Sequence, residues 1–223
     1  MRQETEAFDT VKNNGDCVGI VRLVTEATDA DVHRHGCRSV WEMIRPTRET
    51  SYADANKEHA KALVTAGALE AVIHCMQSHP GHVGVQAEGC FALMCLSAES
   101  AHQVRVAEAG GIAAILTAMA QHRDSTEVQW SGCQALGNVA WNAATRPTIA
   151  EKGGIEAVFH AMTQHSHHEE VQYWGCGVMY CMVHLESARP AIRKGKAVMD
   201  AARNNFPNNS DIKLYLDDIY TKI

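Results

Sequence analysis

The chain has 223 residues, with 20 Lys and Arg against 26 Asp and Glu, so its formal net charge is −6. Apolar residues make up 46% and charged residues 21%, close to the averages of folded globular proteins, which excludes wholesale disorder and a fibrous chain. A net negative charge gives no general attraction for nucleic-acid phosphates or an anionic membrane surface, so no nucleic-acid partner is expected.

The N-terminus, Met1-Arg-Gln-Glu-Thr-Glu, is charged and lacks the apolar core of a secretory signal. The longest uncharged stretch, residues 128–145, carries Gln, Ser and Asn side chains that are costly in hydrocarbon, so no membrane span is expected. Eight cysteines without a signal favour reduced thiols over disulfides. We therefore expect cytoplasmic localisation, with the nucleus as an alternative.

Four Gly-Cys pairs recur along the chain, and their cysteines are Cys37, Cys90, Cys133 and Cys176. The last three lie 43 residues apart. The segment at residues 67–76, Gly-Ala-Leu-Glu-Ala-Val-Ile-His-Cys-Met, returns in related form at residues 110–119 and 153–162, with the same step. Three copies in phase predict a tandem repeat.

The first copy, residues 1–50, is irregular, because Cys37 lies 53 residues before Cys90, ten more than the repeat step. We place an insertion near residues 45–57, a segment with a proline and a cluster of turn-forming residues. A partial helix is expected over residues 5–12, at the start of this copy.

The regular units are predicted at residues 58–100, 101–143 and 144–187. In the middle unit, the apolar spacing predicts an amphipathic helix over residues 111–121 and a longer one over residues 126–141. A shorter helix over residues 102–108 precedes the Gly110-Gly111 corner. Each unit is thus expected to hold a short helix, a glycine corner, a second helix, a polar loop and a long third helix.

The glycine of each Gly-Cys pair falls inside a predicted helix. Glycine in a helix interior costs about 1 kcal/mol relative to alanine, so Gly132 predicts a close helix–helix approach. The neighbouring cysteine is expected to pack in the same apolar seam. Asp124 or Ser125 is the expected N-cap of the long helix.

Residues 188–223 are interpreted as a decayed terminal repeat that caps the array, since the Gly-Gly and Gly-Cys signatures are absent there. The predicted equivalences at the 43-residue step pair Val198 with Ile155, Leu214 with Val171, and Ile219 with Cys176.

Three helices per unit, this period, Ala-Gly-Gly-Ile before the second helix and Gln-Ala-Leu-Gly-Asn-Val-Ala at residues 134–140 resemble the armadillo repeat. The likeness spans nearly the whole chain. It implies a single domain, residues 1–223, that is all-α: a right-handed armadillo-type α-solenoid of about four three-helix repeats with a degenerate C-terminal cap. HEAT repeats, with two helices per unit, are the alternative architecture.

The resemblance further implies a concave groove, lined by the third helices, that receives a segment of a partner protein. In nuclear-import adaptors of this family, a Trp followed four positions later by an Asn forms a ladder that clamps peptide backbone. The matching pairs here are Arg38/Glu42, Phe91/Cys95, Gln134/Asn138 and Gly177/Cys181. Only Asn138 fits, so the import-adaptor ladder is not expected.

Neighbouring positions on the same predicted face carry aromatic rings and amides, which suit a binding surface. Arg34 and Arg38 are candidates to pair with acidic residues of a ligand, or else lie on a solvated helix face. Packing of the tryptophans between repeats is the alternative for the aromatic set. The candidate partner-binding residues are Arg34, Arg38, Phe91, Trp130, Gln134, Asn138, Trp141 and Tyr173.

The 13 histidines raise an enzymatic alternative, a metal-dependent HEAT-like hydroxylase or another His-based enzyme. Such hydroxylases use His-Glu dipeptides on several helices, whereas here only His168-Glu169 occurs, outside a predicted helix. Cys181 and His184 are the nearest nucleophile–base pair, but no third residue orients the histidine. We predict no catalytic residues, no metal site and no cofactor.

The leading hypothesis is therefore a non-enzymatic interaction module or scaffold that binds a protein or peptide segment along the groove. Self-association through the exposed ends of a short solenoid is kept as an alternative.

Overall fold

The computed structural model describes residues 2–44 and 55–223. These residues form fifteen α-helices and two short 3-10 helices, and the described part of the chain contains no strand. The prediction of an all-α protein is therefore confirmed. Most of the insertion expected near residues 45–57 lies outside the described residues.

Three helices form the N-terminal part: α1 Arg2–Asn13, α2 Cys17–Glu26 and α3 Ala30–Ile44. The first helices of the later units are α4 Ala55–Thr65, α7 Ser100–Glu108, α10 Arg146–Glu151 and α13 Arg189–Lys194, and α4 is as long as the second helix of its unit. Second helices follow them as α5 Ala68–Ser78, α8 Gly111–Gln121, α11 Gly154–Gln164 and α14 Lys196–Asn205. The third helices are α6 Val83–Leu96, α9 Thr126–Ala140, α12 Glu169–Met182 and α15 Ser210–Lys222. The 3-10 helices Ala143–Thr145 and Glu186–Ala188 precede α10 and α13.

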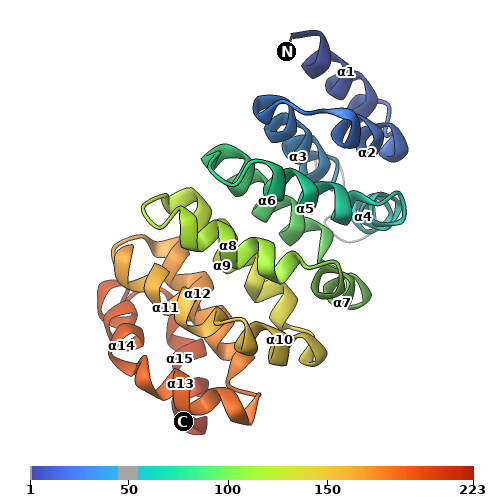
Figure 1. The fold of residues 1–223 in the computed structure, drawn as a ribbon. Helices are drawn as coiled ribbons and strands as arrows, with labels where there is room; N and C mark the ends of the chain where they lie inside the picture. Colours follow the sequence, from blue (N-terminus) through green and yellow to red (C-terminus); the bar gives the residue numbers. More distant parts are fainter. Residues whose placement is uncertain (1, 45–54) are drawn as a thin grey trace.

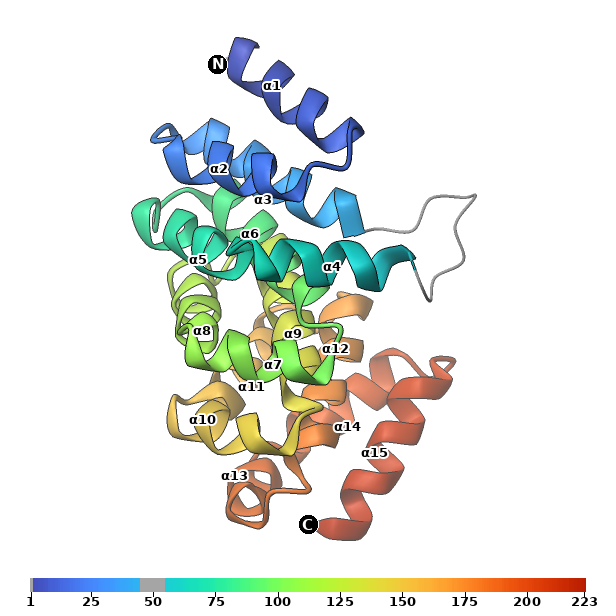
Figure 2. The ribbon, with the colours of Figure 1, turned by 90° about the vertical axis from the view of Figure 1, so that its right-hand side faces the viewer.

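The helices follow one another along the molecule in chain order, from α1 at one end to α14 and α15 at the other (Figures 1 and 2). Each third helix packs on the next: α3 contacts α6, α6 contacts α9, α9 contacts α12, and α12 contacts α15. The second helices form a parallel series, in which α2 contacts α5, α5 contacts α8, α8 contacts α11, and α11 contacts α14. The apolar interior therefore lies between these two layers.

The two glycines of the Gly110-Gly111 corner serve different purposes, whereas the corner before α5 has Ala68 at the second position. Gly110 precedes α8 with a φ of +86°, in the left-handed region that favours glycine, and Gly67 and Gly153 repeat this conformation before α5 and α11. A Cβ on Gly111 would instead lie 2.6 Å from Cγ1 and 2.9 Å from the carbonyl oxygen of Val106. The second glycine is thus required by close approach of α7 and α8.

Glycines inside the third helices pack on methionines of the second helices. A Cβ on Gly132 would lie 2.6 Å from Cγ and 2.8 Å from Sδ of Met119, well inside normal contact distance. Gly89 with Met76 and Gly175 with Met162 repeat the arrangement, whereas Gly36 faces Val24 and Phe8. The predicted close helix approach is confirmed.

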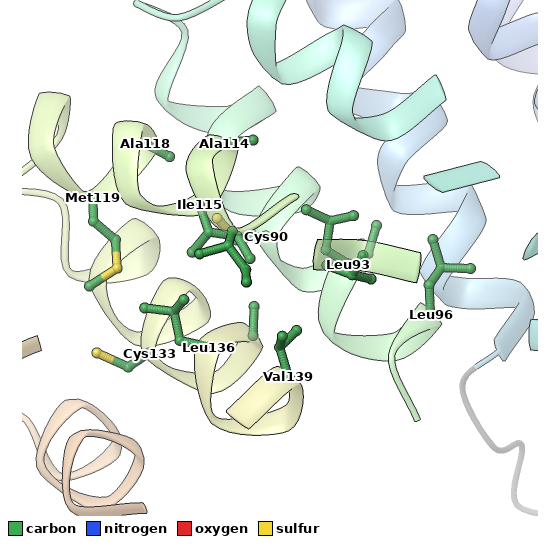
Figure 3. Close-up of a cluster of buried hydrophobic side chains, with 14 of the residues drawn as sticks. Cys90, Leu93, Leu96, Ala114, Ile115, Ala118, Met119, Cys133, Leu136 and Val139 are labelled. Carbon is green, nitrogen blue, oxygen red and sulfur yellow. The ribbon is translucent and has the colours of Figure 1, made fainter. Parts of the chain in front are cut away.

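The cysteines beside these glycines are buried free thiols, as predicted. Figure 3 shows Cys90 and Cys133 among apolar side chains of α6, α8 and α9 that point toward one another. Burial raises the pKa of Cys90 and of Cys133 to about 12, which disfavours the reactive thiolate. These cysteines are core residues.

The helix boundaries follow the predictions closely in the middle unit. The helix expected at residues 111–121 is α8, and that expected at residues 126–141 is α9, which ends one residue earlier with Trp141 as its C-cap. The Ser125 side chain caps α9 by accepting a hydrogen bond from the Val128 backbone N–H at 3.4 Å. The short helix and the N-terminal helix are each longer than predicted, at Ser100–Glu108 and Arg2–Asn13.

The predicted equivalences in the terminal unit are wrong. Leu214 was paired with the buried Val171, but Leu214 is 64% exposed. The buried residues of α15 are instead Ile212, Leu216 and Ile219, which match Val171, Gly175 and Val178 of α12 at a 41-residue step. Asn209 caps α15 at the same step from His168, the N-cap of α12. The last unit is thus two residues shorter, which moves Leu214 to the position of Tyr173.

Candidate partner-binding surface

A row of aromatic rings joins three successive third helices. Trp41 of α3 meets Phe91 of α6 edge to face, with ring centroids 5.0 Å apart, and Phe91 meets Trp130 of α9 in the same way at 5.4 Å. All three rings are half-buried. Trp41 was not among the predicted site residues.

A second aromatic cluster spans α9, α12 and α15. Trp141 is 56% exposed, and its ring lies 6.1 Å from that of Tyr180. Tyr180 lies 5.0 Å from Tyr215, which also meets Tyr173 at 5.9 Å. Tyr173 contacts Trp174 at 4.9 Å. The structure therefore places Tyr173 in this cluster, rather than in ring contact with Trp130 as its repeat position suggested.

The two amides on this face have different surroundings. Asn138 donates from Nδ2 to the Met94 carbonyl oxygen at 3.1 Å, so it ties α9 to the C-terminal end of α6. Its other N–H and its oxygen remain for a ligand. Gln134 Oε1 is buried and has no hydrogen-bond donor among the described residues. Gln134 is thus the amide on this face with a buried, unsatisfied acceptor.

The predicted role of Arg38 needs correction. Its guanidinium pairs with Glu88 of α6, with Nε 2.9 Å from Oε1, and the indole N–H of Trp41 donates to Oε2 of the same carboxylate at 2.7 Å. The hydrogen bond to Glu88 raises the pKa of Arg38 further above its usual value. The acidic partner of Arg38 is therefore internal. Arg34 forms no ion pair with the described residues, and its Cδ packs against Gly84.

Two arginines that the sequence analysis missed cap the third helices. Arg146 donates from Nε to the Ala140 carbonyl oxygen at 2.9 Å and from Nη2 to the Trp141 carbonyl oxygen at 3.2 Å. Arg189 donates from Nε to the Val183 carbonyl oxygen at 3.0 Å, one repeat later. The signal was present as an Arg-Pro dipeptide at the 43-residue step. Cations at these positions donate to carbonyl oxygens that have no partner within the helix, and they interact favourably with the negative end of the helix dipole.

Three histidines at the same step link neighbouring loops. His122 Nε2 lies 2.7 Å from the Pro80 carbonyl oxygen, and His165 Nε2 lies 2.8 Å from the Arg123 carbonyl oxygen. His79, one repeat earlier, is 2.9 Å from Nδ1 of the buried His33 instead. The ring of His165 therefore holds the preceding loop.

Buried glutamines fix the same loops from the third helices. Gln129 donates from Nε2 to the carbonyl oxygens of Met119 and His122, both at 2.9 Å. Gln86 and Gln172 make the equivalent pairs of bonds one repeat before and after. The side-chain N–H groups of these glutamines are therefore used inside the fold.

The residues of the enzymatic alternative lie as follows. His168 is the N-cap of α12 and Glu169 is its first residue, so the dipeptide occupies a helix end, rather than lying wholly outside a helix as expected. No three His, Cys, Asp or Glu side chains gather into a possible metal site within the described residues. Burial raises the pKa of Cys181 to about 11, opposite to what a nucleophilic thiolate beside His184 requires.

The sequence matches no protein-family model, and no curated protein matches it. Within residues 2–44 and 55–223, no helix combines the length and the apolar character needed to cross a membrane. The function is therefore argued from the geometry of the aromatic face.

Proposed function

We propose that the chain is a non-enzymatic interaction module that binds a partner segment across the third helices, and that its architecture is a right-handed armadillo-type α-solenoid. The repeated glycine corners, glycine–methionine contacts and loop-binding glutamines support the architecture, since all recur at one step. A HEAT unit has two helices, and that architecture leaves the first helices α4, α7, α10 and α13 unexplained.

The binding proposal rests on one observation: aromatic rings lie along the series α3, α6, α9, α12 and α15, and among them Trp141 is 56% exposed. Aromatic rings supply large contact area at low entropic cost, and they dominate binding energies at interfaces. An extended segment lying across the helix axes would meet these rings in succession.

The buried Gln134 acceptor adds a polar reason for a partner. An unsatisfied buried oxygen costs about 1–3 kcal/mol, and turning the half-buried Gln134 side chain toward a bound segment would let a backbone N–H of that segment satisfy it. Asn138 beside it can donate only one further N–H, because the other holds Met94. The import-adaptor ladder is not part of the proposal, since a single rung cannot hold a peptide in register.

The test is selection of random 12-residue peptides, displayed on phage, against the immobilised chain. Selected peptides should lose at least about tenfold in affinity for Trp141→Ala and for Gln134→Ala, as expected for a central anchor and an amide contact. Val18→Ala is the matched control, because Val18 is 69% exposed on α2, in the other helix layer. Equal binding to all three variants, or no selected peptide, contradicts the proposal.

We also propose the cytoplasm or nucleus as the place of action. All eight cysteines are free thiols, and reducing compartments keep them so.

A further inference from the structure

The C-terminal ends of α9 and α12 carry a surface of mixed aromatic and cationic character, here called the C-terminal rim. Its residues are Trp141, Arg146, Tyr180, His184 and Arg189. We propose that the C-terminal rim binds an acidic segment of a partner protein that carries a large apolar side chain. This inference rests on the proposed function and adds the chemistry of the partner.

The aromatic part of the rim is open to a ligand. The ring of Trp141 lies edge to face with Tyr180 at 6.1 Å, and Tyr180 meets His184 at 5.8 Å. Trp141 is 56% exposed, the most exposed of the aromatic side chains described above. Neither the Trp141 indole N–H nor the Tyr180 hydroxyl has a hydrogen-bond partner within the described residues. The surface thus offers apolar area together with unused donors.

The cationic part lies between the two helices. Arg146 holds the carbonyl oxygens of Ala140 and Trp141 through Nε and Nη2, which leaves Nη1 without a partner among the described residues. The guanidinium is close enough to α12 to act electrostatically on Cys181. Capping therefore uses one edge of this guanidinium, and the other edge stays available to a carboxylate.

Arg189 repeats the arrangement at the end of α12 with only a weak internal partner. Its Nη1 lies 3.9 Å from Glu186, whose side chain is 86% exposed. An exposed pair at this distance contributes little and is easily exchanged. The described residues place no carboxylate against Arg146, so the charge of the rim is complementary to an acidic partner.

The N-terminal ends of α9, α12 and α15 carry negatively charged side chains, in contrast to the cationic C-terminal rim. Glu127 lies in the first turn of α9, Glu169 and Glu170 in that of α12, and Asp211 in that of α15. A segment bound across the helices would therefore meet cations on one side and carboxylates on the other. This charge distribution favours the segment's acidic side chains at the C-terminal rim, beside Trp141.

A single-stranded nucleic acid is the other ligand that combines stacking with negative charge. The net charge of −6 opposes any polyanion, and it opposes a nucleic acid most, because phosphates along its whole length carry charge, whereas a protein segment needs carboxylates only where it meets the rim. The peptide is therefore the occupant proposed, and the oligonucleotide is an arm of the test.

The test uses the full chain and three fluorescein-labelled 12-residue peptides with the same Leu and Trp residues, in which the other positions are Glu, Gln or Lys, plus a 12-nucleotide oligo-dT. Fluorescence anisotropy at low salt should show the Glu peptide binding about tenfold more tightly than the Gln peptide, with the preference shrinking at high salt. Trp141→Ala should weaken both peptides.

Arg146→Gln should remove most of the difference in affinity between the Glu and Gln peptides, and Arg146→Lys should restore part of that difference. Lys152→Gln is the matched control, because it removes an exposed cation that follows α10. If Arg146→Gln lowers the thermal midpoint, Arg189→Gln provides the second measurement.

Tightest binding of the Lys peptide or oligo-dT, or a Glu preference insensitive to both arginine variants, overturns the inference. Binding of the Gln peptide that depends on Trp141 but shows no Glu preference overturns it too, and leaves the proposed function standing. The proposed function fails separately, if displayed peptides bind independently of Trp141 and Gln134.

Discussion

Gly110 and Gly111 are adjacent, yet the structure requires glycine at each for a different reason, and this difference can be measured. Gly110 has a φ of +86° and nothing within 4 Å of the place where a Cβ would lie. Gly111 needs no positive φ, but its Cβ would meet Cγ1 and the carbonyl oxygen of Val106 at 2.6 and 2.9 Å. The first requirement is conformational and the second is steric.

The magnitudes follow from these geometries. An L-residue in the left-handed region costs about 1–2 kcal/mol, so Gly110→Ala should lower the free energy of unfolding by about that amount. Asn tolerates this region better, so Gly110→Asn should cost less. Gly111→Ala should cost about 1–3 kcal/mol through overpacking, and Gly111→Asn more, because a larger side chain has no space beside a fixed carbonyl.

Urea unfolding followed by circular dichroism at 222 nm gives these free energies, and Val106→Ala separates the two causes. Because Val106→Ala removes the clashing Cγ1, the double variant with Gly111→Ala should be more stable than additivity predicts, by at least about 0.5 kcal/mol. The same cycle with Gly110→Ala should be additive. Coupling of Val106 to Gly110, or its absence for Gly111, would refute this explanation of the corner.

Three further predictions concern stability and reactivity. Burial, and after it the neighbouring His79, lowers the pKa of His33, so the imidazole binds a proton more tightly in the unfolded chain than in the folded one. The free energy of unfolding should therefore fall as pH drops below about 6.5 toward the folded pKa. In urea unfolding measured at a series of pH values, His33→Gln should flatten this part of the pH dependence. Cys133 should resist a thiol reagent in the native state and react at the unfolding rate, whereas fast native labelling would contradict its burial. Asn138→Ala should destabilise the chain by about 1 kcal/mol in thermal melts, because Met94 loses a donor, while Trp141→Ala should change stability by less than about 0.5 kcal/mol.

The sequence predicts most where a pattern is local and repeated. The apolar spacing of α8 defines that helix to the residue, because its buried face recurs with helical period. The last unit was misaligned, because two residues are missing between its buried face and that of α12, and Leu214 is apolar although exposed. Apolar character alone does not reveal the side on which a residue lies.

The candidate site depends on contacts between units, which a single repeat cannot reveal. Arg38 looked available for a ligand, since its pairing with Glu88 joins helices that are 50 residues apart across an irregular insertion. Trp41 was overlooked for the same reason, although it bonds the same carboxylate. By contrast, Arg146 and Arg189 were predictable from their shared Arg-Pro dipeptide and repeat step.

Equivalent positions of the repeat units fall into two kinds, those whose residues stabilise the fold and those suited to bind a partner. Positions that keep one residue type at the 43-residue step are used inside the fold: the glycine that faces a methionine, the glutamine that holds a loop, and the histidine that reaches the preceding loop. The position of Trp130 behaves differently, because its equivalents along the third helices are Arg34, Ala87, Tyr173 and, with the corrected register, Leu214. A position that packed the same neighbours in every unit would need the same shape each time. Since this face varies in charge, size and aromatic character from unit to unit while the scaffold beneath it repeats, its side chains are suited to something that is itself not repetitive, as a partner segment with its own sequence would be.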